Sequence, residues 1–283
     1  MTAKTITLGG DLTITRMGYG AMQLAGPGVF GPPRDRDQAI AVLREAVALG
    51  ITHIDTSDFY GPTVVNELIK EALHPYPEDL VLVTKVGARR GDDASWIPAL
   101  EPDELKAQVH QNLDHLGRDV LDVVNLRAAE HGGSEDSIEK SFTALAELQQ
   151  EGLIRHLGLS AVTIPQIREA QAIAPVVTVQ NLYNLVQRDG DDVVDFCATE
   201  NIAFASFFPL GGFTPLQSET LAKVASRLNA TPQQVALAWL LQRSATSIVI
   251  PGTSSLAHLR ENTAAADLLL PDEAITELNS IAA

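Results

Sequence analysis

The chain has 283 residues, of which 45% are hydrophobic and 20% are charged, an ordinary composition for a globular protein. Its 20 Lys and Arg against 36 Asp and Glu give a formal net charge of −16, which argues against binding to nucleic acid or to an anionic membrane surface. The single cysteine, Cys197, excludes an internal disulfide and a cysteine-based zinc site, and it fits a reducing compartment. We find neither a long apolar run nor an apolar signal segment after Met1, so we expect a cytoplasmic protein.

The first element in chain order is a predicted β-hairpin over Thr5–Thr15. Two short stretches of alternating apolar and polar residues flank Gly9-Gly10, and a glycine pair is a common hairpin turn. After this hairpin the pattern changes to short apolar runs separated by longer stretches with helical periodicity.

Short apolar runs bounded by turn residues predict eight strands: Met17–Ala21, Thr52–Asp55, Leu80–Thr84, Leu121–Leu126, His156–Ser160, Val176–Gln180, Ala203–Phe207 and Ser247–Ile250. Helical periodicity predicts helices between them and near the end of the chain: Arg36–Leu49, Val64–Leu73, Pro102–Leu116, Ser137–Gln150, Ile164–Ala172, Gln187–Thr199, Ser218–Leu228 and Pro271–Ser280. Apolar strands that alternate with helices indicate a parallel sheet buried on both faces.

The repetition of eight strand–helix units, without a flexible linker, favours a single closed (β/α)8 barrel that spans residues 1–283, an α/β fold. The leading hairpin would then close the bottom of the barrel. The segment Gly26–Pro33 is rich in Gly and Pro, so we expect a loop without helix or strand. It follows the first strand and would therefore lie at the C-terminal face, where barrel enzymes have their active sites.

Ionisable residues stand at the C-terminal ends of the second and third predicted strands, namely Asp55 with Tyr60, and Lys85. Buried charges are usually paired or functional. An ammonium beside a phenol would lower the phenol's pKa from its usual value of about 10, and such a tyrosine could protonate a developing alkoxide. In the structural alternative, Asp55 caps a turn, Tyr60 packs in a loop and Lys85 is solvated; the spacing alone leaves both open.

These residues belong to a series of motifs that resembles the aldo-keto reductase family, in family order over essentially the whole chain. The Asp-x4-Tyr-Gly block followed by Thr-Lys at the third strand is the most specific of them. The resemblance implies a (β/α)8 barrel and hydride transfer from NADP(H) to a carbonyl, without a metal. The matching segments are Ile54–Gly61, Thr84-Lys85, Leu116-Gly117, Leu121-Asp122, Gly158–Ser160, Val179–Asn181, Pro209–Gly211, Ile250–Gly252 and Glu261-Asn262.

Two longer stretches, Tyr19–Pro33 and Phe207–Gln217, resemble a bacterial branch of this family that reduces pyridoxal. The resemblance implies reduction of pyridoxal to pyridoxine by a monomer or weak oligomer. A broad-specificity aldehyde or ketone reductase is the alternative among enzymes. A nicotinamide-sensing regulatory subunit with incidental turnover is the alternative from another class, and the presence of the Asp, Tyr and Lys trio weighs against it.

The resemblance also implies roles for individual residues. Tyr60 would donate the proton, and Asp55 and Lys85 would set its pKa. Ser160 and Gln180 would hold the nicotinamide carboxamide. The rest of the cofactor would contact Gly20, Ala21, Phe207, Pro209, Leu210, Gly211, Thr253, Ser254, His258, Glu261 and Asn262, with a helix N-terminus near the adenosine end favouring phosphate.

The sequence departs from the family pattern at the end of the fourth strand, where Arg127 stands in place of the usual catalytic histidine. Arginine stays protonated and cannot shuttle a proton, but its planar guanidinium can bind an anion. We expect Arg127 to be the fourth catalytic residue, which orients the carbonyl and pairs with an anionic group such as the phenolate oxygen of pyridoxal. Pairing with Glu130 or Asp55 is the structural alternative.

Other departures concern the cofactor and the substrate. Ala161 replaces a common Asn and would lose one hydrogen bond to the carboxamide, worth about 1 kcal/mol. Phe207 replaces a stacking Tyr. Near the ribose 2′-phosphate the frequent Lys is replaced by Gly252, which leaves Thr253, Ser254, His258 and Arg260 as phosphate partners and weakens the preference for NADP over NAD. Arg89 and Arg90 could bind an anionic substrate or be ordinary charges at the rim.

Overall fold

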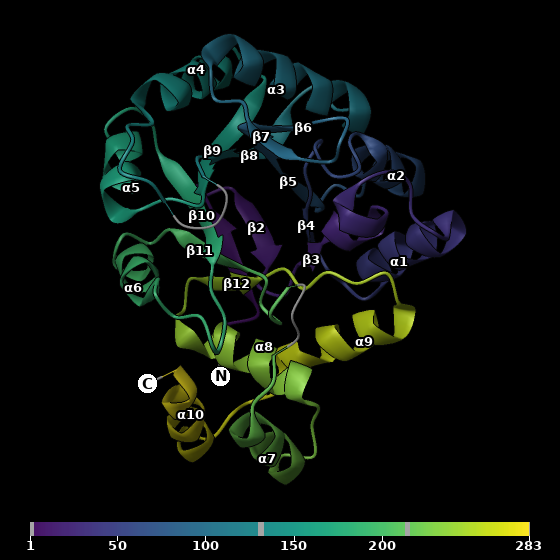
Figure 1. The fold of residues 1–283 in the computed structure, drawn as a ribbon, viewed down its shortest axis with the longest axis vertical. Coiled ribbons are helices and arrows are strands. Elements are labelled where there is room, and N and C mark those ends of the chain that lie inside the picture. Colours follow the sequence, from purple (N-terminus) through teal and green to yellow (C-terminus); the bar gives the residue numbers. More distant parts are fainter. Residues whose placement is uncertain (1–2, 130–132, 213–215, 283) are drawn as a thin grey trace.

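The computed structural model describes residues 3–129, 133–212 and 216–282. It confirms the predicted barrel of parallel strands, which Figure 1 shows near the centre of the molecule. Around the barrel the strands are β3 (Tyr19–Gly20), β4 (His53–Asp55), β5 (Val81–Val86), β8 (Leu121–Arg127), β9 (Ile154–Ser160), β10 (Val176–Leu182), β11 (Ala203–Phe207) and β12 (Ser247–Val249). All eight coincide with predicted runs, and β5, β8 and β10 extend one or two residues further toward the C-terminal face.

Backbone contacts between the first and last strands close the barrel, and we call this line of contact the seam. Met17 and Val249 form a parallel bridge, and the Gly18 N–H donates to the Val249 carbonyl at 2.8 Å. A Cβ atom at Gly20 would lie 2.5 Å from the carbonyl oxygen of Ile250. The seam therefore requires glycine at this position.

Arg16 ties the seam to the helix that precedes the last strand. Its side chain is 2% exposed, and its Nε donates to the Ser247 carbonyl at 2.8 Å. Its Nη2 donates to the carbonyl oxygens of Leu241 and Ser244, at the C-terminal end of α8 (Pro232–Arg243). A cation is favourable there because the last carbonyls of a helix lack partners and carry partial negative charge.

Helices surround the barrel (Figure 1), and the predicted ranges are confirmed to within a few residues. They are α1 (Arg36–Ala48), α2 (Val64–Leu73), α3 (Pro102–Leu116), α4 (Glu139–Gln150), α5 (Ile164–Gln171), α6 (Asp191–Thr199), α7 (Glu219–Arg227), α9 (Leu256–Ala264) and α10 (Asp272–Asn279). The ranges of α8 and α9 were not predicted. The sequence of α8 shows no helical periodicity because Val235 to Leu241 are all buried and leave no polar face. None of the helices in the described ranges is long and apolar enough to cross a membrane.

The N-terminal hairpin closes the bottom of the barrel, as predicted. It consists of β1 (Thr5–Leu8) and β2 (Leu12–Thr15) in antiparallel pairing. Leu8, Leu12 and Ile14 pack in one apolar cluster with residues near the starts of the barrel strands, such as Val81 and Ala203. In the hairpin turn, the carboxylate of Asp11 pairs with Arg155 and His156 of β9, which fixes the hairpin to the barrel wall.

Two features at the opposite end differ from the sequence prediction. Pro27–Val29 form a short 3-10 turn, so the expectation that Gly26–Pro33 holds no helix is wrong; Gly28 permits the turn because its φ is 68°. A second antiparallel hairpin, β6 (Ala88–Arg90) with β7 (Trp96–Pro98), stands between β5 and α3 and was not predicted.

Candidate active site

Three side chains expected to act together do meet at the C-terminal mouth of the barrel. Lys85 on β5 and Asp55 on β4 form an ion pair with 2.6 Å between Nζ and Oδ1, and each side chain is only 4% exposed. The Lys85 ammonium also lies 5.2 Å from the centre of the Tyr60 ring. The structural alternative, in which Lys85 is solvated, is therefore wrong.

The electrostatics of this trio differ from the sequence prediction. Burial raises the pKa of Tyr60 above its usual value of 10.0, and although Lys85 and Arg127 act to lower the pKa, burial outweighs them. The prediction that Lys85 would bring the Tyr60 pKa below 10 is therefore wrong for this structure. Burial alone would lower the pKa of Lys85, but attraction to Asp55 and Tyr60 raises it instead. At neutral pH the trio thus holds a protonated phenol beside an ammonium.

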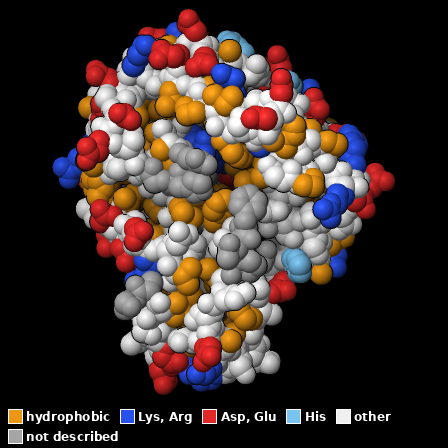
Figure 2. Space-filling view, viewed as in Figure 1, with side chains coloured by type: hydrophobic (Ala, Val, Ile, Leu, Met, Phe, Trp, Pro, Cys, Tyr) orange, Lys and Arg blue, Asp and Glu red, His pale blue; other side chains and the backbone are white. Residues whose placement is uncertain are grey.

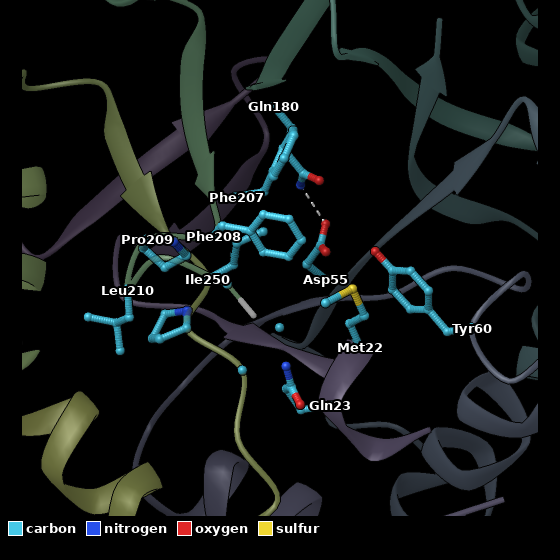
Figure 3. A pocket seen from close by; sticks show the side chains of 14 residues that line it. Met22, Gln23, Asp55, Tyr60, Gln180, Phe207, Phe208, Pro209, Leu210 and Ile250 are labelled. Atoms are coloured by element: carbon cyan, nitrogen blue, oxygen red, sulfur yellow. Dashed lines mark hydrogen bonds between the residues drawn. The ribbon is translucent and has the colours of Figure 1, made fainter. Parts of the chain in front are cut away.

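Gln180 on β10 completes this polar group. Its Nε2 donates to Oδ2 of Asp55 at 2.7 Å, the contact drawn in Figure 3. The two carboxylate oxygens of Asp55 therefore have different donors, Lys85 on one and Gln180 on the other. Gln180 was expected to hold a nicotinamide carboxamide, and in this structure its amide nitrogen donates to Asp55.

A hollow of about 570 Å³ opens beside Tyr60, within the usual size range of small-molecule pockets. Figure 3 shows the Tyr60 hydroxyl pointing into it near Asp55, with Pro209 and Leu210 on the opposite side. We call it the first hollow. It is lined by Gly20, Met22, Gln23, Asp55, Tyr60, Gln180, Phe207, Phe208, Pro209, Leu210, Gly212, Ile250, Pro251 and Gly252.

A second hollow, of about 690 Å³, adjoins the first. Figure 2 looks onto this face and shows a central depression with apolar side chains along its edge. The two hollows share five lining residues, and Tyr60 is one of them, so Tyr60 lies at the border between the hollows. The second hollow is lined by Met22, Phe59, Tyr60, Lys85, Trp96, Arg127, Ser160, Gln180, Phe207 and Phe208.

Arg127, at the end of β8, lies in the wall of the second hollow. Its guanidinium carbon is 5.2 Å from the centre of the Trp96 ring and 5.9 Å from that of Phe59. A cation at such distances from aromatic faces is held by cation–π attraction. The guanidinium is therefore in place to meet a bound molecule beside Tyr60 and Lys85.

Strained backbone marks two strand ends at this mouth. Ala161, directly after β9, has φ 57°, and Phe208, directly after β11, has φ 52°. Residues other than glycine rarely adopt this left-handed region, and those that do concentrate at functional sites. The Ala161 N–H donates to the Gln180 carbonyl at 2.9 Å, which holds the strained residue against β10.

The structure separates the expected cofactor residues into two groups. Near the mouth, Ala21 is buried rather than lining a hollow, and Gly211 lies in the turn after Phe208, where its neighbour Gly212 lines the first hollow. The other residues expected at this end line a hollow. They are Gly20, Gln180, Phe207, Pro209 and Leu210 in the first hollow and Ser160 in the second.

The adenosine-end residues lie around the start of α9. Ser254 and His258 are exposed, and Ser255 caps the helix by accepting from the His258 N–H. Thr253 is buried, and its carbonyl accepts from the Tyr19 hydroxyl at 2.7 Å. Asn262 is also buried.

Two charged residues of α9 have partners within the protein. The Glu261 carboxylate accepts from the Thr231 hydroxyl at 2.7 Å, which ties it to the N-terminus of α8. The guanidinium of Arg260 pairs with Glu45 at 2.7 Å. Both side chains are thus already engaged by neighbouring helices.

Sequence reasoning missed several lining residues. Met22 and Gln23 follow β3, and Pro251 follows β12, so the rule that strand C-termini carry the active site could have identified them. Phe59 lies one residue before Tyr60. Trp96 had no such signal, because it enters the site from an unpredicted hairpin.

The first hollow fits a nicotinamide dinucleotide. Gly20, Gly212 and Gly252 line it, which exposes backbone where a flat ring and a pyrophosphate approach closely. The chain runs from Gly252 to the Ser255 cap of α9 within three residues, so a helix N-terminus that favours phosphate lies beyond the hollow.

A model of the Aldo/keto reductase family matches residues 16–283, and the chain belongs to this family of oxidoreductases. Pyridoxine 4-dehydrogenase of Escherichia coli (strain K12) is 62% identical over 284 residues, which is 99% of each chain. An uncharacterized oxidoreductase of Schizosaccharomyces pombe is 38% identical over 95% of this chain and 87% of its own.

Solved structures agree with the assignment. A thermostable aldo-keto reductase in complex with the inhibitor epalrestat has a TM-score of 0.83 and 29% identity, over 98% of this chain and 99% of its own. An aldo-keto reductase from Klebsiella pneumoniae in complex with NADPH has a TM-score of 0.79 and 25% identity, over 99% of this chain and 95% of its own. The family relationship makes this chain a nicotinamide-dependent enzyme that interconverts carbonyl and hydroxyl groups.

Proposed function

We propose that this protein reduces pyridoxal to pyridoxine with NADPH in the second hollow. The observation that carries the chemistry is the buried Lys85–Asp55 pair beside Tyr60, at the border of the two hollows. The choice of substrate is supported by the 62% identity with the E. coli pyridoxine 4-dehydrogenase.

The proposed roles follow from the contacts. The nicotinamide supplies a hydride when it is bound in the first hollow. Tyr60 donates its phenolic proton to the carbonyl oxygen, and the Lys85 ammonium stabilises the phenolate that remains. Asp55 keeps Lys85 charged and in place, and Gln180 holds the second oxygen of Asp55. Ser160 pairs with Gln180 across neighbouring strands and lines the adjoining second hollow, and it would hold the carboxamide of the bound nicotinamide.

Arg127 takes part in substrate binding in this proposal. Pyridoxal carries a phenolic oxygen next to its aldehyde, and a fixed guanidinium can bind the anionic form of that oxygen. Support comes from the place of Arg127 in the same wall as Tyr60 and Lys85. Because a hydrogen bond to a charged group contributes about 1.5–3 kcal/mol, Arg127→Met is expected to raise the KM for pyridoxal roughly tenfold or more.

NADP(H) is the proposed cofactor, and the K. pneumoniae complex with NADPH supports it. Ser254 and His258, exposed at the N-terminus of α9, are the proposed partners of the 2′-phosphate. Arg260 is a weaker candidate because it pairs with Glu45. We also propose that the protein is cytoplasmic and is a monomer or a weak oligomer. The proposed location is in line with the single cysteine, Cys197, which is buried and forms no disulfide.

Steady-state kinetics with pyridoxal and unrelated aldehydes, each with NADPH and NADH, test the proposal. We expect the highest kcat/KM for pyridoxal with NADPH. Tyr60→Phe should lower kcat by roughly 10² to 10⁴, the usual contribution of a general acid, while NADPH binding is retained. Wild-type activity in Tyr60→Phe would show that another group donates the proton, and equal rates with all aldehydes would favour a broad-specificity reductase.

A further inference from the structure

The β6–β7 hairpin builds part of the wall of the second hollow. Trp96, the first residue of β7, lines the hollow and packs edge-to-face against Phe59 with 5.6 Å between ring centres. Phe59 packs in the same manner against Tyr60, at 5.4 Å. A continuous row of aromatic rings therefore leads from the hairpin to the phenol of the proposed proton donor.

Arg90 stacks on the Trp96 ring. Its guanidinium carbon lies 3.9 Å from the centre of the Trp96 ring, a close stack. Arg90 itself lines a different, neighbouring hollow, together with Asp58, Pro62 and His115. The sequence-based option that Arg90 binds an anionic substrate directly does not fit this position.

The hydrogen bonds of Arg90 fasten the hairpin to the segment Gly26–Pro33. Nη1 donates to the Val29 carbonyl at 2.7 Å, and Nη2 donates to the carbonyls of Gly28 at 3.1 Å and Ala94 at 2.7 Å. One planar guanidinium thus joins the 3-10 turn, the hairpin turn and the indole ring. A lysine side chain carries the same charge, but it has neither a planar group that can stack on the indole nor several N–H donors in a fixed arrangement.

The same segment is fixed to the turn that carries Tyr60. The Gly61 N–H donates to the Val29 carbonyl at 3.3 Å, and the Gly31 N–H donates to the Gly61 carbonyl at 2.9 Å. Val29 has φ 58°, a conformation that a β-branched residue adopts only when its surroundings impose it. The contacts of Arg90 and Gly61 with the Val29 carbonyl are part of those surroundings.

From these contacts we propose that Arg90 is a positioning residue which holds Trp96 beside the substrate, so that the enzyme prefers planar aromatic carbonyl compounds. The proposal rests on the carbonyl reduction proposed above and identifies what sets the substrate class. An aromatic ring gains stacking with Trp96, whereas a short aliphatic aldehyde gains little from it. Both substrates use Tyr60 in the same way.

The test compares kcat/KM for pyridoxal with kcat/KM for a short aliphatic aldehyde in matched variants. Arg90→Lys and Trp96→Ala should each lower the ratio of the two values about tenfold, mainly through the KM for pyridoxal. Trp96→Phe, which keeps a ring, should restore part of the ratio. Arg89→Lys is the control and should leave the ratio unchanged, because Arg89 is 59% exposed and only reaches Glu104 at 3.9 Å.

A binding measurement separates this inference from the proposed function. The chain has two tryptophans, and Trp239 is buried against Tyr183, away from the second hollow. Pyridoxal should quench the fluorescence of the wild type and of Arg89→Lys, and quench Trp96→Phe and Arg90→Lys much less. An unchanged kinetic ratio in Arg90→Lys, or unchanged quenching in Trp96→Phe, overturns the inference. Absence of turnover in the wild type with quenching intact overturns only the proposed function.

Discussion

The pKa of Tyr60 depends on two opposing effects, burial and the positive charges nearby. A sequence shows that a lysine and an aspartate accompany the tyrosine, but it does not show how completely they are removed from water. In the structure burial has the larger effect on the phenol, so its pKa rises above 10.0 in spite of Lys85. The same burial makes the Lys85–Asp55 attraction strong enough to keep the ammonium charged.

The raised pKa of Tyr60 predicts the pH dependence of carbonyl reduction. Reduction needs the protonated phenol, and a group with a raised pKa keeps its proton until the pH exceeds its ordinary value. We therefore expect kcat to be nearly constant from about pH 7 to 9 and to fall only above about pH 10. The measurement is a pH profile of kcat at saturating pyridoxal and NADPH. An alkaline limb centred near pH 8 would contradict the prediction.

Some contacts within the site also cannot be predicted from the local sequence. The bond from Gln180 to Asp55 joins residues 125 positions apart, and no local pattern reports it. The resemblance to the family did bring Asp55, Tyr60, Lys85 and Gln180 to attention, and the structure brings these four together. It assigned Gln180 only to the cofactor because motifs list residue types and not their partners.

At the level of elements, apolar runs predicted the barrel strands because each strand is buried on both faces. The same logic failed for α8, whose seven buried residues in a row resemble no amphipathic helix. Its Thr231-Pro-Gln-Gln234 start, a capping box with Pro in the first turn, was a usable local signal. The β6–β7 hairpin had no local sequence signal, because its conformation depends on Arg90 and on a loop that is distant in sequence.

The N-terminal hairpin gives a prediction in which stability changes and activity does not. Ile14 is completely buried against the barrel interior, so Ile14→Ala should lower the free energy of unfolding by about 2–5 kcal/mol. The hairpin lies at the end opposite Tyr60, and kcat of the folded fraction should be unchanged. Urea unfolding followed by circular dichroism provides the measurement.

The control for this prediction is Thr13→Ala on the same strand, whose side chain is exposed. We expect a change within about 0.5 kcal/mol there. A comparable loss in both variants would mean that the strand, and not the buried contact, determines the stability.

For the molecule as a whole, Arg16 links the start of the barrel to α8 and to the last barrel strand. It donates to carbonyl oxygens of Ser247, Leu241 and Ser244, and nothing in its local sequence distinguishes it from an exposed arginine. Arg16→Leu would leave these buried carbonyls without their charged donor. We expect unfolding to become easier by about 3 kcal/mol or more, measured by urea titration or calorimetry.

Lys223→Leu is the control for Arg16→Leu, because it also replaces a cation by leucine but does so on the protein surface. Lys223 is 76% exposed and lies 3.7 Å from Glu219 within α7, so its removal should change stability by less than about 0.5 kcal/mol. Equal effects of the two variants would show that net charge, and not the seam, is responsible.

The seam has a further consequence for biosynthesis. The pocket that faces Tyr60 takes Gly20 from the first barrel strand and Ile250 and Gly252 from the end of the last one. A nascent polypeptide on the ribosome can therefore form helices and pair neighbouring strands, but it cannot complete this pocket until residues 250–252 have been made. Protection by a dinucleotide against proteolysis should accordingly begin only after Gly252 has left the ribosome.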